Sequence, residues 1–256
     1  AVLVSLLAGP GDAPTAAKIT LDEAVELTRT VAPRVEEIRG LKFKRPVAVK
    51  VVDDKVAREH FKARIVKEYP EAKLRADERA YAQLGLIPAG SQLLAAFLDI
   101  LEEQAGGYYD PETDTFYVLD DMPKGVGPIL VAHELTHALD DQHYGIDGML
   151  DAVKDDDDRA SAVGAVVEGS GTVVMSAFLM QEMQAGRLEP AALAEMQKTQ
   201  AGQGAKLAAA LPFLRRSLLS SYVLGFPFLL RGDLTKLTAV NPADLNRAFE
   251  KPPTSS

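Results

Sequence analysis

Residues 126–143 read VGPILVAHELTHALDDQH, and this stretch decides both the fold class and the chemistry that we expect. Apolar residues surround its polar centre on several sides of a helical wheel, which predicts a buried helix. Pro128 suits the first turn of that helix, and Gly145 suits the position just past its end. His133 and His137 are separated by about 40° around the helix axis, so both rings project from one face.

Two imidazoles on one face of a helix can bind a single metal ion, and a carboxylate next to the first can serve as a base. His133 and His137 are therefore the predicted metal ligands, and Zn²⁺ is the ion typical of the His-Glu-x-x-His pattern. Glu134 would take a proton from a water whose pKa the ion has lowered to about 7. The alternative for this segment is a core helix in which both histidines only pack.

Catalytic zinc usually has three protein ligands, and His143 is one candidate for the third. Its spacing is that of the last His in the metzincin pattern, where a Gly between the second and third His turns the chain sharply. Asp140 stands at the position of that Gly. If the helix continues, His143 lies about 120° around from His137 and misses the metal. We therefore expect His143 to be an ordinary polar residue in the last turn of the helix.

Glu168 is the favoured third ligand. It lies in RASAVGAVVEGSGTVVMSAFLMQEM, residues 159–183, where no other charge occurs between Arg159 and Glu182. An ionised carboxylate in so apolar a helix needs a cation or strong hydrogen bonds, and a zinc ion meets that need. Its small neighbours would also let two helices approach closely enough to share a metal. A structural Glu that caps or bridges helices is the alternative.

These motifs resemble a known enzyme group. HELTH followed by an apolar helix with Glu168 resembles the gluzincins, the thermolysin-like zinc metallopeptidases. More closely, four runs resemble a largely uncharacterised bacterial family of predicted metallopeptidases of this type. They are GGYYDPETDTFYVLDD, AHELTHALDDQHYGID, DDDDRASAVGAVVEGSGTVVM and SYVLGFPFLL. The resemblance implies a zincin-like α+β fold, zinc held by His133, His137 and Glu168, and Glu134 as the base.

The sequence departs from the family pattern in the residues that would surround the ligands. Thr172 stands where many gluzincins have an Asp that orients a metal-binding His. Ser170 stands where the closer family often has an acidic residue. Asp141, one turn beyond His137 on the same face, is the candidate substitute.

Two further features bear on the reaction. Residues 106–120 predict a β-hairpin, since strand formers flank a turn-rich centre. In the proteases that the chain resembles, a strand just before the metal helix pairs with an extended peptide substrate; a plain scaffold hairpin is equally compatible with the sequence. Tyr222 is the candidate oxyanion donor, because a phenol can donate to a tetrahedral intermediate. The alternatives for that role are Tyr81, Tyr108, Tyr109 and Tyr117.

Composition limits the class of protein. In 256 residues, 47% hydrophobic and 25% charged content is typical of a globular chain. The net charge of −9 argues against a nucleic acid as partner, because no basic stripe could replace phosphate counterions. The chain has no Cys, which excludes disulfides, thiol catalysis and Cys-ligated zinc.

The remaining pattern predicts an α+β fold with a small mixed sheet. We expect helices at 20–39, 54–69 and 91–105, with Thr20 as the first N-cap, and a strand at 46–52. The apolar stretches 160–181 and 207–230 contain charges, glycines or prolines, so we interpret them as buried helices and expect no integral membrane span. Residues 20–256 would form one domain, with a sheet-containing lobe to about 150 and a helical lobe from about 151.

The amino terminus and the acidic run allow weaker expectations. Residues 1–19 resemble the tail of a signal peptide, which predicts an exported protein; a mobile arm on a cytoplasmic protein is the alternative. Residues 155–158 are four consecutive Asp, which favour the positive end of the following helix dipole. Calcium binding there is disfavoured, because contiguous Asp residues cannot all face one ion.

Together these features predict a zinc metallopeptidase whose partner is a peptide or protein substrate. One alternative is a zinc hydrolase of a non-peptide amide or ester, recognisable by a closed pocket without a free sheet edge. The other is a catalytically inactive zincin-like binding protein that keeps the motif as packing.

Overall fold

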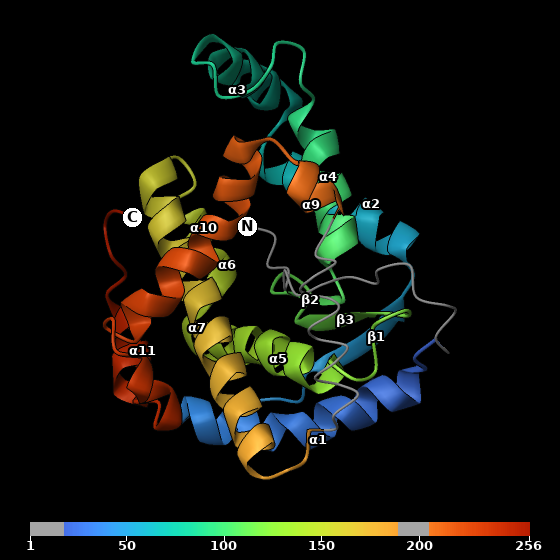
Figure 1. Ribbon diagram of the computed structural model, residues 1–256, viewed down its shortest axis with the longest axis vertical. Helices are drawn as coiled ribbons and strands as arrows, with labels where there is room; N and C mark the ends of the chain where they lie inside the picture. The colour runs from blue at the N-terminus through green and yellow to red at the C-terminus, as the bar shows by residue number, and fades with distance from the viewer. Residues whose placement is uncertain (1–17, 189–204) are drawn as a thin grey trace.

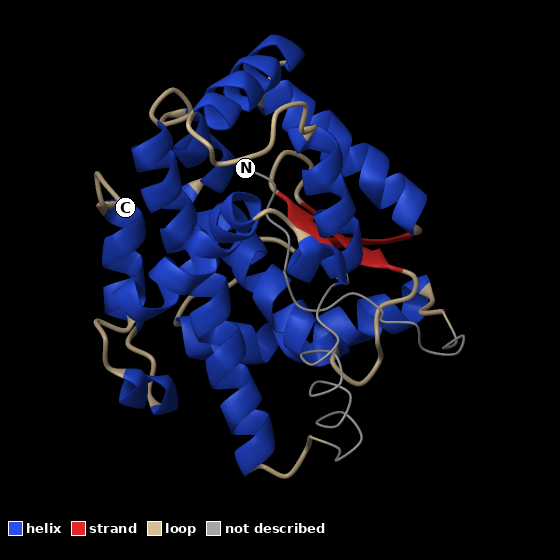
Figure 2. Ribbon diagram, turned by 45° about the horizontal axis from the view of Figure 1, so that its top comes forward, coloured by secondary structure: helices blue, strands red, loops and turns tan. Residues whose placement is uncertain are grey.

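The computed structural model describes residues 18–188 and 205–256, and helices dominate this part of the chain (Figures 1 and 2). The helices and strands occur in the order α1 Leu21–Arg39, β1 Ala48–Val52, α2 Asp54–Glu68, α3 Glu71–Gln83, α4 Leu93–Gln104, β2 Gly107–Asp110, β3 Thr115–Leu119, α5 Gly127–Tyr144, α6 Ile146–Asp151, α7 Asp157–Gln184, α9 Ala205–Ala209, α10 Pro212–Leu229, the 3-10 helix η1 Leu234–Thr238 and α11 Pro242–Glu250. The expected α+β class with a small sheet is confirmed, whereas its likeness to zincins stays a prediction. The predicted N-terminal arm lies, up to residue 17, outside the described residues.

Local signals set several helix ends. Thr20 and Glu23 form a capping box at α1, in which each side chain bonds the backbone N–H of the other. Helix α1 ends at Gly40, whose φ of 69° is favourable only without a Cβ. Within the acidic run, the Asp156 carboxylate accepts a hydrogen bond from Arg159 N and caps α7. These contacts confirm the predicted start of α1 and place the acidic run at the start of α7.

The sheet has the strand order β1-β3-β2. Strands β2 and β3 form the predicted hairpin, with Tyr109 opposite Phe116, and β1 pairs with β3 in parallel. Strand β2 is therefore an edge strand, and all four of its residues are buried. The green helix α5 passes next to this edge in Figure 1.

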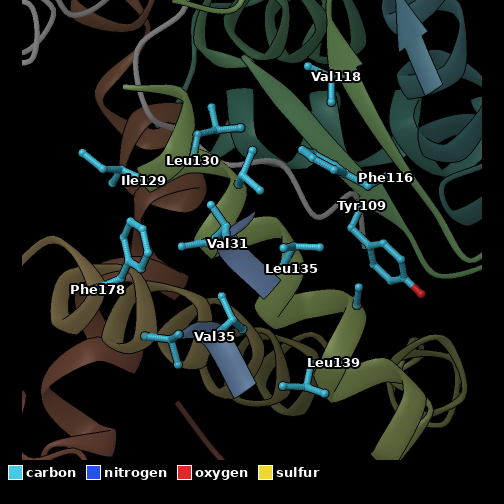
Figure 3. Close-up of a cluster of buried hydrophobic side chains, with 14 of the residues drawn as sticks. Val31, Val35, Tyr109, Phe116, Val118, Ile129, Leu130, Leu135, Leu139 and Phe178 are labelled. Carbon is cyan, nitrogen blue, oxygen red and sulfur yellow. The ribbon is translucent and has the colours of Figure 1, made fainter. Parts of the chain in front are cut away.

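One hydrophobic core connects the sheet to the long helix α7. It includes Val31 and Val35 of α1, Phe116 of β3, Leu135 of α5 and Phe178 of α7 (Figure 3). Because α7 contributes to the same core as the sheet, the predicted sheet-containing and helical lobes pack together through α5 and α7. This packing determines how the two helices face each other.

The structure corrects two expectations. Helix α3 was not predicted, because Leu74 is its only buried residue and it therefore has no apolar stripe. The segment 207–230 is not one buried helix: it divides between α9 and α10, and Val223 and Phe228 on α10 are 64% and 50% exposed. Only one face of α10 packs against the protein, so the prediction of burial is wrong there.

Among the residues that the structure describes, one helix, α7, is long and apolar enough to cross a membrane. In the fold, 72% of its most apolar window is buried inside the protein. That burial fits the expectation that residues 160–181 belong to a core helix.

Candidate metal centre

Three side chains from two helices converge at one buried point. Nε2 of His133 and Nε2 of His137 on α5 are 2.9 Å apart, and Glu168 Oε2 on α7 lies 3.3 Å from the first and 3.5 Å from the second. All three ligand atoms lie within 4.8 Å of one another. In the part of the chain that the structure describes, this is the only group of three or more His, Asp or Glu residues that could hold a metal.

A glycine makes room for this arrangement. Gly171 lies one turn after Glu168, so it faces the same neighbour, α5. A Cβ added to Gly171 would come within 2.7 Å of His133 Cε1 and 2.9 Å of both ring nitrogens. The absence of a side chain at this position therefore lets the His133 imidazole pack directly against α7.

The two histidines keep the Glu168 carboxylate negatively charged. Burial alone would raise the pKa of Glu168, but hydrogen bonds with His133 and His137 outweigh it and lower the pKa to about 2. Burial and the neighbouring His137 lower the pKa of His133. Burial also opposes charge on His137, yet contact with Glu168 raises its pKa. Glu168 is therefore ionised at neutral pH.

The donor set fits Zn²⁺. Two imidazole nitrogens and one carboxylate oxygen are a common protein ligand set for a catalytic zinc ion. At 2.9 Å, at most one of the two facing Nε2 atoms can donate a proton to the other, whereas a cation would use the lone pairs of both. A cation would also offset the burial of the Glu168 carboxylate.

Glu134 is fully buried and faces strand β2. Its Oε2 accepts a 2.8 Å hydrogen bond from the backbone N–H of Tyr109. Its charge helps to raise the pKa of His137, so the carboxylate lies near the ligand cluster without being part of it. Edge strand β2 thus fixes the orientation of the predicted base.

Tyr222 of α10 lies beside the cluster. Its ring stacks on that of His133 with 6.1 Å between centroids. The other tyrosines considered have different neighbours: Tyr109 donates to Asp141, Tyr108 and Tyr117 stack on each other, and Tyr81 packs on Phe213. Among these five tyrosines, Tyr222 is the one in ring contact with a predicted ligand.

Asp141 does not orient a ligand imidazole as expected. Its carboxylate accepts hydrogen bonds from the Tyr109 hydroxyl at 2.9 Å and from Ile146 N at 2.7 Å. It therefore holds the hairpin and the turn into α6. His143 likewise points away from the cluster, as predicted, with Nε2 at 2.8 Å from Lys42 O.

A buried polar network next to the ligands was missed by sequence reasoning. Asp140 accepts from Arg39 Nε at 2.7 Å and from Ser170 Oγ at 2.6 Å, and Arg39 Nη1 donates to Asn246. Asp140 and Arg39 have fully buried side chains. Asp140 and Ser170 each depart from a family pattern, so each was noticeable in the sequence. Nothing in the sequence indicated that the two side chains form a hydrogen bond with each other.

A cavity of about 430 Å³ reaches the cluster from the Glu168 side. Residues of α2, α3, α4, α6, α7 and α10 form its walls, and Glu168 and Tyr222 line it. No residue of β2 contributes to the lining. The cavity therefore approaches the metal ligands between helices and not along the sheet edge.

Comparison with known proteins gave no match: no protein-family model, no curated protein and no solved structure is detectably similar to this chain. The resemblance of its motifs to gluzincins thus stays a prediction from the sequence.

Proposed function

We propose that this protein is a zinc-dependent hydrolase. The observation that carries the proposal is the convergence of His133, His137 and Glu168 at one buried point, with Glu134 held beside them. These residues come from two helices far apart in the sequence, and their donor set suits zinc. Such a cluster is hard to explain as packing, because burying a carboxylate and two imidazoles has an energetic cost.

Each residue has a distinct role in the proposed reaction. A bound zinc ion supplies Lewis acidity, which lowers the pKa of water and polarises a carbonyl. Glu134 accepts the proton from the attacking water and later donates it to the leaving group. The Tyr109 N–H holds one Glu134 oxygen and so limits the orientations of the base. Tyr222 would donate a hydrogen bond to the oxyanion.

Peptide hydrolysis is the first candidate activity. Its support is the position of β2, an edge strand whose backbone bonds Glu134 next to the ligands. An extended peptide could pair with such an edge. The second candidate is hydrolysis of a non-peptide amide or ester, and its support is the helix-lined cavity that reaches Glu168 without involving β2.

Metal analysis and two variants test the proposal. We expect freshly purified protein to contain one zinc per chain and Glu168→Ala to lose it. Glu134→Gln should keep the zinc and lose hydrolysis of a fluorogenic peptide library and of acyl amides and esters. Wild-type protein without metal after zinc reconstitution would exclude the hydrolase, and undiminished turnover by Glu134→Gln would exclude Glu134 as base.

A further inference from the structure

The cavity beside Glu168 is elongated along helix α7. Asp157, Ser161, Gly164 and Glu168 line it at spacings of three or four residues, so they form one face of the helix. At 1.5 Å per residue, this face extends about 16 Å from Asp157 to Glu168. The cavity volume of about 430 Å³ lies in the range of small-molecule sites.

Helix α10 forms a second wall of the cavity. Figure 1 shows α7 and α10 next to each other, with α3 at the top of the view and α4 to the right of α10. Glycines permit this approach, since a Cβ on Gly225 would come within 1.8 Å of Ala165 O. Phe213, Ser217 and Tyr222 of α10 line the cavity. The cavity is thus a groove between two closely packed helices and the apolar side chains opposite them.

The opposite wall is mainly apolar. Leu74, Leu93 and Leu101 are buried there, and the rings of Tyr81 and Phe213 meet at 4.6 Å along one side. Lys73 and Lys154, which also line the cavity, are exposed, and the half-buried carboxylates Glu68 and Asp77 there pair with Arg64 and Lys73. Burying a hydrocarbon chain against these walls would remove apolar surface from water on both sides of the contact.

The helical backbone of the walls offers little to a polypeptide main chain. A peptide presents one N–H and one C=O per residue, and each needs a partner when it is buried. The backbone groups of α7 and α10 are used within their own helices, and the Ser217 hydroxyl already donates to Phe213 O at 3.0 Å. A linear hydrocarbon makes no such demand. The length of such a chain also fits the groove. An acyl chain of a lipid spans one leaflet of a bilayer core, which is about 15 Å thick, and the face of α7 is of similar length.

We propose that this groove binds a linear hydrocarbon chain along α7, with the functional group at the end of the chain placed at Glu168 and Tyr222. Resting on the proposed hydrolase function, the substrate class is an amide or ester of a fatty acyl chain. The leaving group would be small, because His133, Glu134 and His137 are at most 1% exposed and the protein around them is closed.

Ligand binding tests the groove without relying on turnover. The zinc-loaded protein is titrated with cis-parinaric acid, and the bound probe is then displaced by dodecanol, by dodecanoate or by a blocked pentaalanine. We expect both dodecyl compounds to displace the probe at micromolar concentration and the peptide to leave it bound. Displacement by the peptide alone, or no probe binding at all, would overturn the proposal.

Two variants locate the binding site. Gly164→Leu fills the groove halfway along α7, where only Ser221 Oγ lies near the new Cβ, and Ser217→Phe fills it from an exposed position on α10. Each should weaken dodecanol binding at least ~tenfold. Val223→Phe is the matched control, because Val223 is exposed on α10 outside the groove. Equal affinity in wild type and Ser217→Phe would place the chain elsewhere and reject the proposal.

The same measurements separate this inference from the proposed function. Dodecanol has no group that requires a metal, so its binding is also measured on wild-type protein from which a chelator has removed any metal. Chain binding by wild-type protein that takes up no zinc on reconstitution would support the groove and exclude the hydrolase. Zinc binding and peptide hydrolysis without chain binding would support the hydrolase and exclude the groove.

Discussion

The Ser170 hydroxyl donates a 2.6 Å hydrogen bond to the Asp140 carboxylate and so ties α7 to α5 beside the predicted metal ligands. Asp140 lies one turn after His137, and Ser170 lies two residues after Glu168. The second oxygen of Asp140 accepts from Arg39, which anchors α1 to the same point. This network fixes the relative position of the two helices that carry the ligands.

Removal of the Asp140 carboxylate should strongly destabilise the protein. Asp140→Ala leaves the buried Arg39 guanidinium without its ion partner, which costs about 3–5 kcal/mol in comparable pairs. Ser170→Ala leaves one oxygen unpaired and should cost about 1–3 kcal/mol. Urea denaturation measures both values. The exposed pair of Arg29 with Glu26 gives the control, because Glu26→Ala should leave the midpoint unchanged; an equally small effect of Asp140→Ala would contradict the proposed anchoring.

Gly171→Ala should weaken zinc binding with little effect elsewhere. The new Cβ would meet the His133 ring at 2.7–2.9 Å, so the imidazole must move away from α7 and from Glu168. We expect at least a ~tenfold rise in the zinc dissociation constant, measured by competition with a chelator. Gly148→Ala is the control, because a Cβ there has no neighbour within 4 Å. Identical zinc affinities in the two variants would show that the close contact does not position His133.

The metal-free protein should lose stability in acid partly through Glu168. Its pKa falls from 4.5 to about 2 on folding, despite burial, because of its contacts with the two histidines. A carboxylate with a lowered pKa stabilises the fold above pH 4.5, and this contribution disappears as the pH falls towards 2. Compared with Glu168→Gln, wild type should therefore be more stable at pH 5, by at most about 3 kcal/mol, with the difference shrinking below pH 4.5. Chemical denaturation at a series of pH values measures it, and a pH-independent difference would contradict the assignment.

Tyr222→Phe should lower kcat without releasing zinc. The Tyr222 ring stacks on His133 at 6.1 Å and is retained in the variant, so only the hydroxyl is lost. Loss of an oxyanion donor typically lowers kcat by about 10²–10³-fold. Turnover of the best substrate and zinc content are measured together. Tyr117→Phe serves as control, since Tyr117 stacks on Tyr108; wild-type turnover in Tyr222→Phe would remove the Tyr222 hydroxyl from the mechanism.

The sequence by itself determined the features that depend on neighbours along the chain. The spacing of His133 and His137 places both rings on one face of any helix, and Thr20 with Glu23 starts α1 wherever that helix packs. The hairpin before α5 follows from its turn residues in the same way. For Glu168, the sequence indicated a buried carboxylate in need of compensation, because its apolar surroundings are local too.

Only the tertiary structure decided which segments meet. The approach of Glu168 to the histidines depends on how α5 and α7 pack, and Gly171 and the contact of Ser170 with Asp140 contribute to that packing. The walls of the groove include residues of α3, α4 and α10. One face of α10 packs against α7, and the opposite face is therefore exposed. A periodic pattern predicts that a face is apolar, but it does not identify the partner of that face, because contacts distant in sequence depend on the shapes of both surfaces.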